Sequence, residues 1–157
     1  AAIATRVNCI ETEDCAAACL EMADGTLVTL SVTLGSAEEI TRLRFCFAHL
    51  TVESALHPYR PASDPWRFVP RDPETAAEVK TLLQDFHPGP EGFEGLFAEL
   101  AASLETGEEP PVTLADARRS IELATALYYA AATREAVELP LRPSHPAYGG
   151  WLRWLPA

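Results

Sequence analysis

The chain has 157 residues, of which 23 are acidic and 12 are basic, and its formal charge at pH 7 is −11. A length of this order predicts one domain, residues 1–157, that removes roughly 70% of its unfolded surface from water and needs no covalent staple. The negative charge argues against nucleic acid and anionic membranes as partners, because both attract clusters of Lys and Arg.

Two further classes of protein are disfavoured by the sequence. No apolar run approaches the roughly 20 residues that cross a bilayer, and the first residues lack the apolar segment of a secretory signal, so we expect a cytoplasmic protein. The cysteines form no CxxC pair, and on a strand Cys15 and Cys19 would lie about 13 Å apart, too far for a disulfide or a shared metal. We therefore expect Cys9, Cys15, Cys19 and Cys46 to be small buried thiols, with no metal site.

Alternating apolar residues in the first third of the chain predict antiparallel strands. The clearest pair flanks Asp24-Gly25, a strong hairpin signal. A turn near Ala48-His49 separates two later runs. The predicted strands cover residues 2–9 (a weak pattern), 14–22, 27–34, 40–47 and 50–54.

The same alternation divides the predicted sheet into an aliphatic face, which includes Val28, Leu30 and Val32, and a second face of small, hydroxyl and Arg residues. The second face either meets solvent, as is normal for antiparallel sheets, or meets another copy of the chain, an alternative that its scarcity of Lys and Glu favours. Composition leaves both interpretations open. The candidate oligomer face consists of Cys15, Ala17, Cys19, Thr29, Ser31, Thr33, Arg42 and Arg44.

Prolines cluster between residues 55 and 73 and predict a long irregular connection, which in a compact domain is often functional. It carries Tyr59, Arg60, Trp66 and Arg67, which are residue types that contact sugars or carboxylates by stacking and by bidentate hydrogen bonds. The alternative is a proline-stiffened excursion whose aromatic side chains cover the sheet edge. From these residues alone the alternative is preferred.

Three helices follow in the sequence pattern. Helical periodicity covers residues 74–86 and 93–104, and a third helix begins at Thr113, where Asp116 completes a capping box, and lies against the aliphatic face. Val137, Leu139 and Leu141 then alternate with polar residues and predict an edge strand. The side chains expected to be buried in the first two helices are Ala77, Leu82, Leu83, Phe86, Phe93, Leu96, Phe97, Leu100 and Leu104. The last segment, residues 144–156, is called the tail. Its Trp151 and Trp154 are expected to dock on the body of the domain or on a partner subunit.

The sequence contains no motif that assembles a reaction. It has no GxGxxG after a strand, no GxxxxGK[ST], no GxSxG and no HExxH. Its histidines are scattered and mostly adjoin proline, so a surface position is expected for each. We predict no catalytic, cofactor-binding or metal-binding residue.

The order of these segments resembles the C-terminal domain of the Gfo/Idh/MocA family of oxidoreductases, named after glucose-fructose oxidoreductase, inositol dehydrogenase and rhizopine catabolism. Three passages carry the resemblance: EDCAAACLEMADGTLVTLSVTL from Glu13, FEGLFAELAASLETGEEPPV from Phe93, and residues 114–141. Where that family commonly has Gly after the last long helix, this chain has Thr133-Arg134-Glu135, so a left-handed cap there would cost on the order of 1 kcal/mol.

The resemblance implies an α+β fold, with a largely antiparallel open-faced sheet and helices packed on one face. It also implies a function: the substrate-side and oligomerisation domain of an NAD(P)-dependent sugar or polyol oxidoreductase. An upstream Rossmann domain would bind NAD or NADP and supply the catalytic residues, so this chain alone would bind no cofactor and be inactive. The expected partners are that domain and further copies of the chain, joined through the open sheet face.

Two alternatives remain at this stage. One is a freestanding, non-catalytic binding or scaffold domain. The other, ranked last, is a small open-sheet enzyme that uses His57 or His87.

Overall fold

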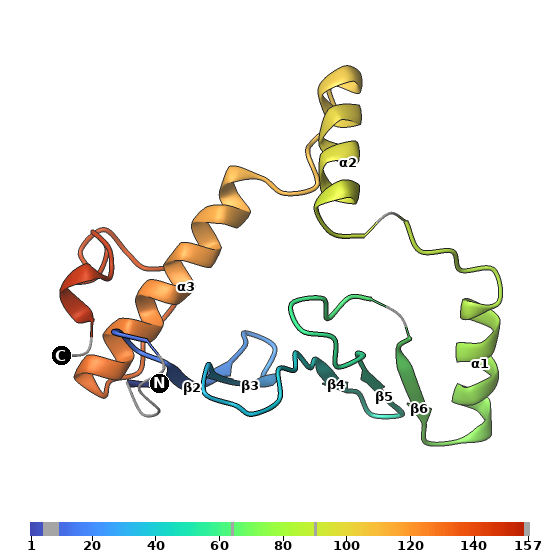
Figure 1. The fold of residues 1–157 in the computed structure, drawn as a ribbon, viewed down its shortest axis with the longest axis horizontal. Coiled ribbons are helices and arrows are strands. Elements are labelled where there is room, and N and C mark those ends of the chain that lie inside the picture. Colours follow the sequence, from blue (N-terminus) through green and yellow to red (C-terminus); the bar gives the residue numbers. More distant parts are fainter. Residues whose placement is uncertain (5–9, 64, 90, 156–157) are drawn as a thin grey trace. The chain divides into compact units, whose positions relative to one another are not determined.

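The computed structural model describes residues 1–4, 10–63, 65–89 and 91–155. Its fold is α+β, as predicted, with antiparallel sheets and α-helices along the chain (Figure 1). The chain divides into two compact units. The terminal unit comprises Ala1–Ala37 and Val112–Ala157, and the central unit comprises Glu38–Pro111.

The terminal unit contains a sheet in the order β1-β2-β3, formed by β1 (Ala2–Ala4), β2 (Cys15–Glu21) and β3 (Leu27–Thr33). The predicted hairpin is confirmed, and Leu20 pairs with Val28 beside its turn. Gly25 lies in the turn with a φ of +84°. The Gly25 N–H donates to the Met22 carbonyl at 2.9 Å, and the Met22 N–H donates to the Thr26 carbonyl at 2.9 Å. This is a three-residue loop with glycine at the left-handed position. Residues 5–9 of the predicted first strand, including Cys9, lie outside the described residues.

The register of β2 and β3 divides the sheet as the sequence predicts. Residues directly opposite each other share a face, so Ala18 lies beside Leu30 on the aliphatic face and Cys19 lies beside Thr29 on the other. Ile3 of β1 pairs with Ala16 on the aliphatic face. Helix α3 packs against β1, while Val32 on β3 is 58% exposed.

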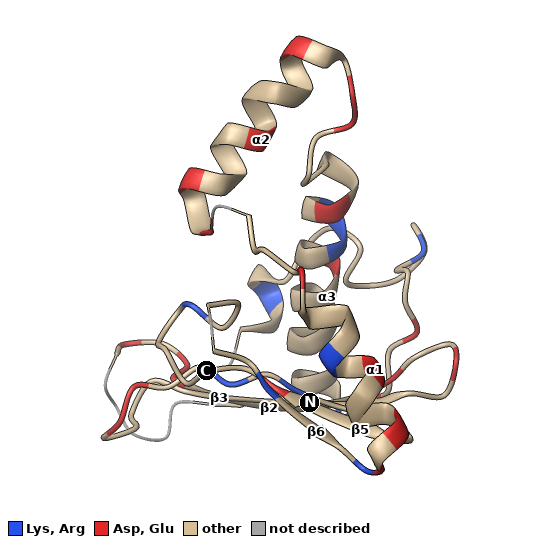
Figure 2. Cartoon of the chain, turned by 90° about the vertical axis from the view of Figure 1, so that its right-hand side faces the viewer, with Lys and Arg blue, Asp and Glu red and all other residues tan. Residues whose placement is uncertain are grey.

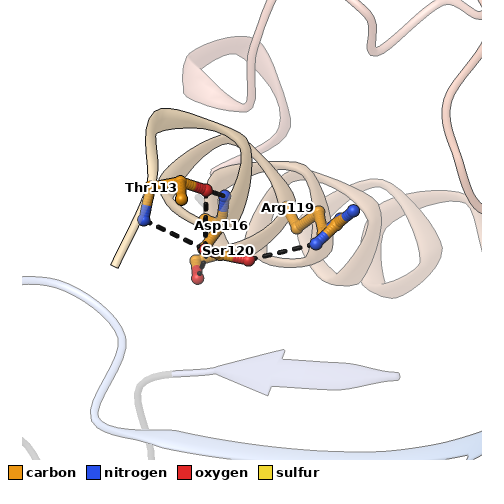
Figure 3. A network of polar contacts seen from close by, with 4 residues as sticks. All are labelled: Thr113, Asp116, Arg119 and Ser120. Carbon is orange, nitrogen blue, oxygen red and sulfur yellow. Dashed lines mark hydrogen bonds and ion pairs between the residues drawn. The ribbon is translucent and has the colours of Figure 1, made fainter. Parts of the chain in front are cut away.

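Helix α3 (Leu114–Thr133) begins with the predicted capping box. The Asp116 N–H donates to Thr113 Oγ1 at 3.2 Å, and the Asp116 carboxylate accepts from the Thr113 N–H at 3.0 Å (Figure 3). The Arg119 guanidinium, 3.0 Å from the same carboxylate, adds an ion pair within the first turns. The helix ends at Thr133, and its C-cap, Arg134, adopts a left-handed φ of 65°, a conformation that is strained for a residue other than glycine.

The prediction of an edge strand over Val137–Leu141 is wrong. Residues 134–138 have no regular secondary structure, and 139–140 form a bend. Pro140 removes one donor that a strand would need, and the next donor, the Leu141 N–H, binds Glu122 Oε1 of α3 at 2.8 Å. Leu141 is buried, with 5% of its surface exposed. The segment is therefore held by a helix side chain instead of a neighbouring strand.

The tail docks on α3, which confirms that part of the prediction for its indoles. Trp151 stacks on Tyr128 with ring centroids 6.4 Å apart. Trp154, in the short 3₁₀ helix Leu152–Trp154, meets the edge of Tyr129 at 4.8 Å, and His145 meets the same ring at 4.7 Å.

The central unit contains a second antiparallel sheet, in the order β4-β5-β6. Its strands are β4 (Arg44–Cys46), β5 (Leu50–Glu53) and β6 (Arg67–Pro70). Strand β4 is shorter than the predicted run over residues 40–47. Strand β6 corrects the expectation of a wholly irregular connection between residues 55 and 73, because Arg67 to Pro70 pair in register with β5.

Two helices complete the central unit: α1 (Pro73–Leu83), capped by the Asp72 side chain, and α2 (Gly92–Thr106). All charged positions of α2 are acidic (Figure 2). The expectation of buried apolar stripes is wrong for most of these positions. Leu96 and Leu100 are half-buried, whereas Ala77, Leu82, Leu83, Phe86, Phe93, Phe97 and Leu104 are exposed. Within the described part of the chain, no helix has the length and apolar character required to cross a membrane.

Candidate functional site

The substrate-side candidate Arg67 belongs to a charged cluster on one face of the central sheet. Its position on β6 lies directly across from Glu53 on β5, and Glu53 lies directly across from Arg44 on β4. Arg67 Nε donates to Glu53 Oε2 at 3.0 Å and Arg67 Nη2 contacts the same oxygen, while Arg44 Nε lies 3.2 Å from Glu53 Oε1. One carboxylate thus holds two guanidinium groups, one on each side.

The electrostatics of this cluster favour an ionised Glu53. Its pKa is lowered below the ordinary value of 4.5, first by the hydrogen bond from Arg67 and then by the charges of Arg67, Arg44 and Arg42. The Glu53 side chain is only 18% exposed, whereas those of Arg44 and Arg67 are 58% and 66% exposed. Two guanidinium groups therefore contact one carboxylate, and both retain donors that face water.

A second cluster fixes Arg60, another substrate-side candidate, to the start of α2. Arg60 Nη2 donates to Glu91 Oε2 at 3.4 Å, and Ser63 Oγ donates to the same oxygen at 2.9 Å. Ser63 is buried and Arg60 is exposed. Glu91 therefore holds the loop and leaves part of the Arg60 guanidinium accessible.

The two aromatic candidates occupy different environments. The Tyr59 N–H donates to Thr41 Oγ1 at 3.0 Å, the residue has a left-handed φ of 58°, and it is 84% exposed. Trp66 is half-buried: its ring stacks on Phe45 at 6.4 Å, and its Nε1–H donates to the Ala62 carbonyl at 3.1 Å. The Trp66 environment matches the alternative in which an aromatic ring covers the sheet edge, whereas Tyr59 keeps a free ring.

The oligomer-face candidates fall into two groups in different units. Six lie on one face of β2 and β3, where Cys15 Sγ is 3.4 Å from Thr33 Oγ1. Cys15 is half-buried, and the others, Ala17, Cys19, Thr29, Ser31 and Thr33, are exposed. Arg42 and Arg44 belong to the central unit, around Glu53.

The expectation of buried thiols is wrong for Cys19 and Cys46, which are exposed. Cys19 lies on β2 and Cys46 on β4. Cys15, Cys19 and Cys46 are free thiols. Among the described residues, no group of His, Cys, Asp or Glu side chains is arranged to hold a metal ion.

The two carboxylates that organise these clusters, Glu53 and Glu91, are not among the site residues predicted from the sequence. The signal for Glu53 was its alternation with Leu50 and Val52, which places it on the polar face of a strand, but its partner strand β6 was not predicted. Glu91 carries no comparable signal, because it follows a loop and precedes a helix.

The arrangement suits binding rather than acid catalysis. Exposed guanidinium groups donate hydrogen bonds to carboxylate or hydroxyl oxygens, and an ionised Glu53 accepts them from hydroxyl groups. A carboxyl group with a lowered pKa is a poor proton donor at neutral pH. Comparison with protein-family models, with curated proteins and with solved structures found no match for this chain.

Proposed function

We propose that the chain is the substrate-side and oligomerisation domain of a cytoplasmic NAD(P)-dependent sugar or polyol oxidoreductase of the Gfo/Idh/MocA type. In this proposal an upstream Rossmann domain binds NAD or NADP and carries the catalytic residues. The α+β fold, the antiparallel hairpin and the capped helix α3 are consistent with the resemblance in sequence.

The observation that carries the proposal is the Arg44–Glu53–Arg67 cluster. A sugar or polyol presents many hydroxyl groups, each of which donates and accepts hydrogen bonds. Guanidinium donors on either side of an ionised carboxylate acceptor supply both roles on one sheet face. Arg60 adds a third exposed guanidinium group, in the loop between β5 and β6.

Steady-state kinetics of the full-length enzyme test this role. Arg67→Ala removes a guanidinium group held by Glu53 and should lower kcat/KM about 10- to 100-fold, because charged hydrogen bonds contribute about 1.5–3 kcal/mol. Arg60→Ala should have a smaller effect in the same direction, because its guanidinium lies 3.4 Å from its one carboxylate partner.

Arg71→Ala is the matched control. Arg71 directly follows β6 and is exposed, and its backbone N–H donates to the His49 carbonyl. The kcat/KM of the Arg71→Ala enzyme should stay within about twofold of the wild-type value. Unchanged kinetics for both Arg60→Ala and Arg67→Ala would refute the substrate-side role.

The competing function is a freestanding binding or scaffold domain, which the exposed faces of the terminal sheet also suit. The coding sequence on the amino side of Ala1 separates the two. About 120 to 200 codons that include GxGxxG support the oxidoreductase, whereas a start codon at that point supports the scaffold. Tight binding of NAD(H) by residues 1–157 alone would contradict both.

A further inference from the structure

A cavity of about 850 Å³ lies within the terminal unit, between the middle of α3 and the tail. Helix α3 contributes Arg118, Ile121, Glu122 and Thr125 to its lining, and the tail contributes residues 148–153. Small-molecule sites usually measure about 300–1,000 Å³, so the cavity is large enough for a metabolite. None of the substrate-side candidates lines it.

The tail that forms one wall is fixed at several points along α3. Glu122 accepts the Leu141 N–H, and Leu141, which also lines the cavity, is buried. Further along, Trp151 stacks on Tyr128 and Trp154 packs against Tyr129. Anchors on both sides of the lining segment preorganise the cavity, which reduces the entropy cost of binding.

The charged groups of the cavity leave an excess of positive charge. Arg118 and Arg153 line it together with one carboxylate, Glu122. Glu122 already accepts the Leu141 N–H, and Arg118 Nη2 approaches it only to 3.9 Å. Arg153 stands over the Trp154 ring at 5.1 Å, which orients its guanidinium without neutralising it. Both arginines therefore keep donors for an anion.

Most of the other side chains in the wall are apolar: Ile121, Leu141, Trp151 and Leu152, beside Thr125 and Tyr148. Gly149 and Gly150 contribute backbone only. An apolar pocket with a few convergent polar groups is the usual form of a small-molecule site. We propose that this cavity binds a small organic anion, whose carboxylate or phosphate contacts Arg118 and Arg153 and whose apolar body lies against Ile121 and Trp151.

Titration of the ¹⁵N-labelled chain with phenyl phosphate tests the proposal, because this probe combines an anion with an apolar ring. The indole N–H signals of Trp151 and Trp154 should shift with a Kd on the order of 1 mM, as expected for a ligand of this size. The signal of Trp66, which does not line the cavity, should not move. Benzoate in place of phenyl phosphate distinguishes a carboxylate site from a phosphate site.

Two further titrations separate the parts of the probe. Inorganic phosphate lacks the apolar body and phenol lacks the charge, so each should bind at least about tenfold more weakly. Equal binding of phenol would contradict the role of the arginines. Shifts at Trp66 as large as those at Trp151 would show non-specific binding and overturn the proposal.

Arg118→Gln and Arg119→Gln form a matched pair on the same helix turn. Arg119 is paired with Asp116 and does not line the cavity. Arg118→Gln should weaken phenyl phosphate about tenfold or more, and Arg119→Gln should leave its Kd unchanged. Both side chains are more than half exposed, so both variants should fold, as checked by circular dichroism. Equal affinities in the two variants would refute the site.

Discussion

The terminal unit and the central unit are stabilised in different ways. In the terminal unit, segments far apart in sequence meet on α3 through aromatic packing and half-buried hydrogen bonds. In the central unit, they meet through ion pairs and caps near the surface. The terminal contacts are Tyr128 with Glu13, Leu141 with Glu122 and Trp154 with Tyr129. The central contacts are Glu53 with Arg44 and Arg67, Glu91 with Arg60, and Asp72 with His49.

This difference indicates which conditions should weaken each unit. Packing and buried hydrogen bonds respond little to salt, whereas exposed ion pairs contribute about 0–1 kcal/mol each and are screened by it. We expect acid and salt to loosen the central unit first. Trp66 reports on the central unit, and Trp151 and Trp154 report on the terminal unit, so indole signals follow the two separately.

The largest effect should come from removing a buried side chain of the terminal unit. Leu141→Ala should lower the free energy of unfolding by about 2–4 kcal/mol, because Leu141 is only 5% exposed. Leu82→Ala in α1 should change it by less than about 0.5 kcal/mol, because Leu82 is 77% exposed. Urea denaturation of both variants measures the difference. Equal losses would mean that the contrast between the units is wrong.

The next effect concerns Tyr128, whose hydroxyl donates to Glu13. Burial, then the hydrogen bond to Glu13 and its charge, raises the pKa of Tyr128 from 10.0 to about 12. Tyr128→Phe should cost about 1 kcal/mol at neutral pH through the lost hydrogen bond.

The same tyrosine predicts a pH dependence. Because the pKa of the folded protein is the higher one, the stabilisation is complete below pH 10 and is lost as the pH rises through about 12. The difference between wild type and Tyr128→Phe in urea denaturation should therefore shrink over that interval. A constant difference across it would contradict this assignment.

Helix α3 should lose a similar amount of stability when its first turn is uncapped. Thr113→Ala removes the side-chain acceptor for the Asp116 N–H, and should cost about 1 kcal/mol. Thr113→Ser keeps the hydroxyl and should cost only a few tenths of that amount. Thermal unfolding followed at Trp151 compares the two, and equal midpoints would show that the capping box contributes nothing.

The smallest effect should appear in the central unit. Glu53→Gln removes the charge shared by Arg44 and Arg67, and should lower the midpoint of unfolding seen at Trp66 in low salt. The loss should diminish in about 1 M salt, where screening is strong. In the wild type this stabilisation is present above pH 4.5 and is lost as the pH falls through the lowered pKa of Glu53. A loss that is independent of salt would indicate packing instead.

Features determined by neighbouring residues could be predicted from the sequence. Asp24-Gly25 specifies the hairpin turn, and Thr113 with Asp116 specifies the start of α3, because the interacting groups are at most four residues apart. Strand β6 could not be found in this way. It has four residues and ends in a proline, and only its pairing with β5 makes it a strand.

The candidate site shows the same limit. Arg60 and Arg67 were selected for their chemistry, and the structure places both beside carboxylates. The identity of those carboxylates depends on tertiary contacts, since Glu53 lies 14 residues from Arg67 and Glu91 lies 31 residues from Arg60. Trp66 had the right chemistry for stacking on a ligand, but its ring packs on Phe45.

The order β1-β2-β3 has a consequence for handling the protein. Among the described strands, β3 is at one edge of its sheet, and its sequence LVTLSVT contains neither a charge nor a proline. Edge strands usually carry such residues, which discourage another chain from adding to the ladder. Seven uncharged residues of high β-propensity also resemble segments that form amyloid. The strand that makes the hairpin easy to recognise is thus also a segment through which the chain could aggregate.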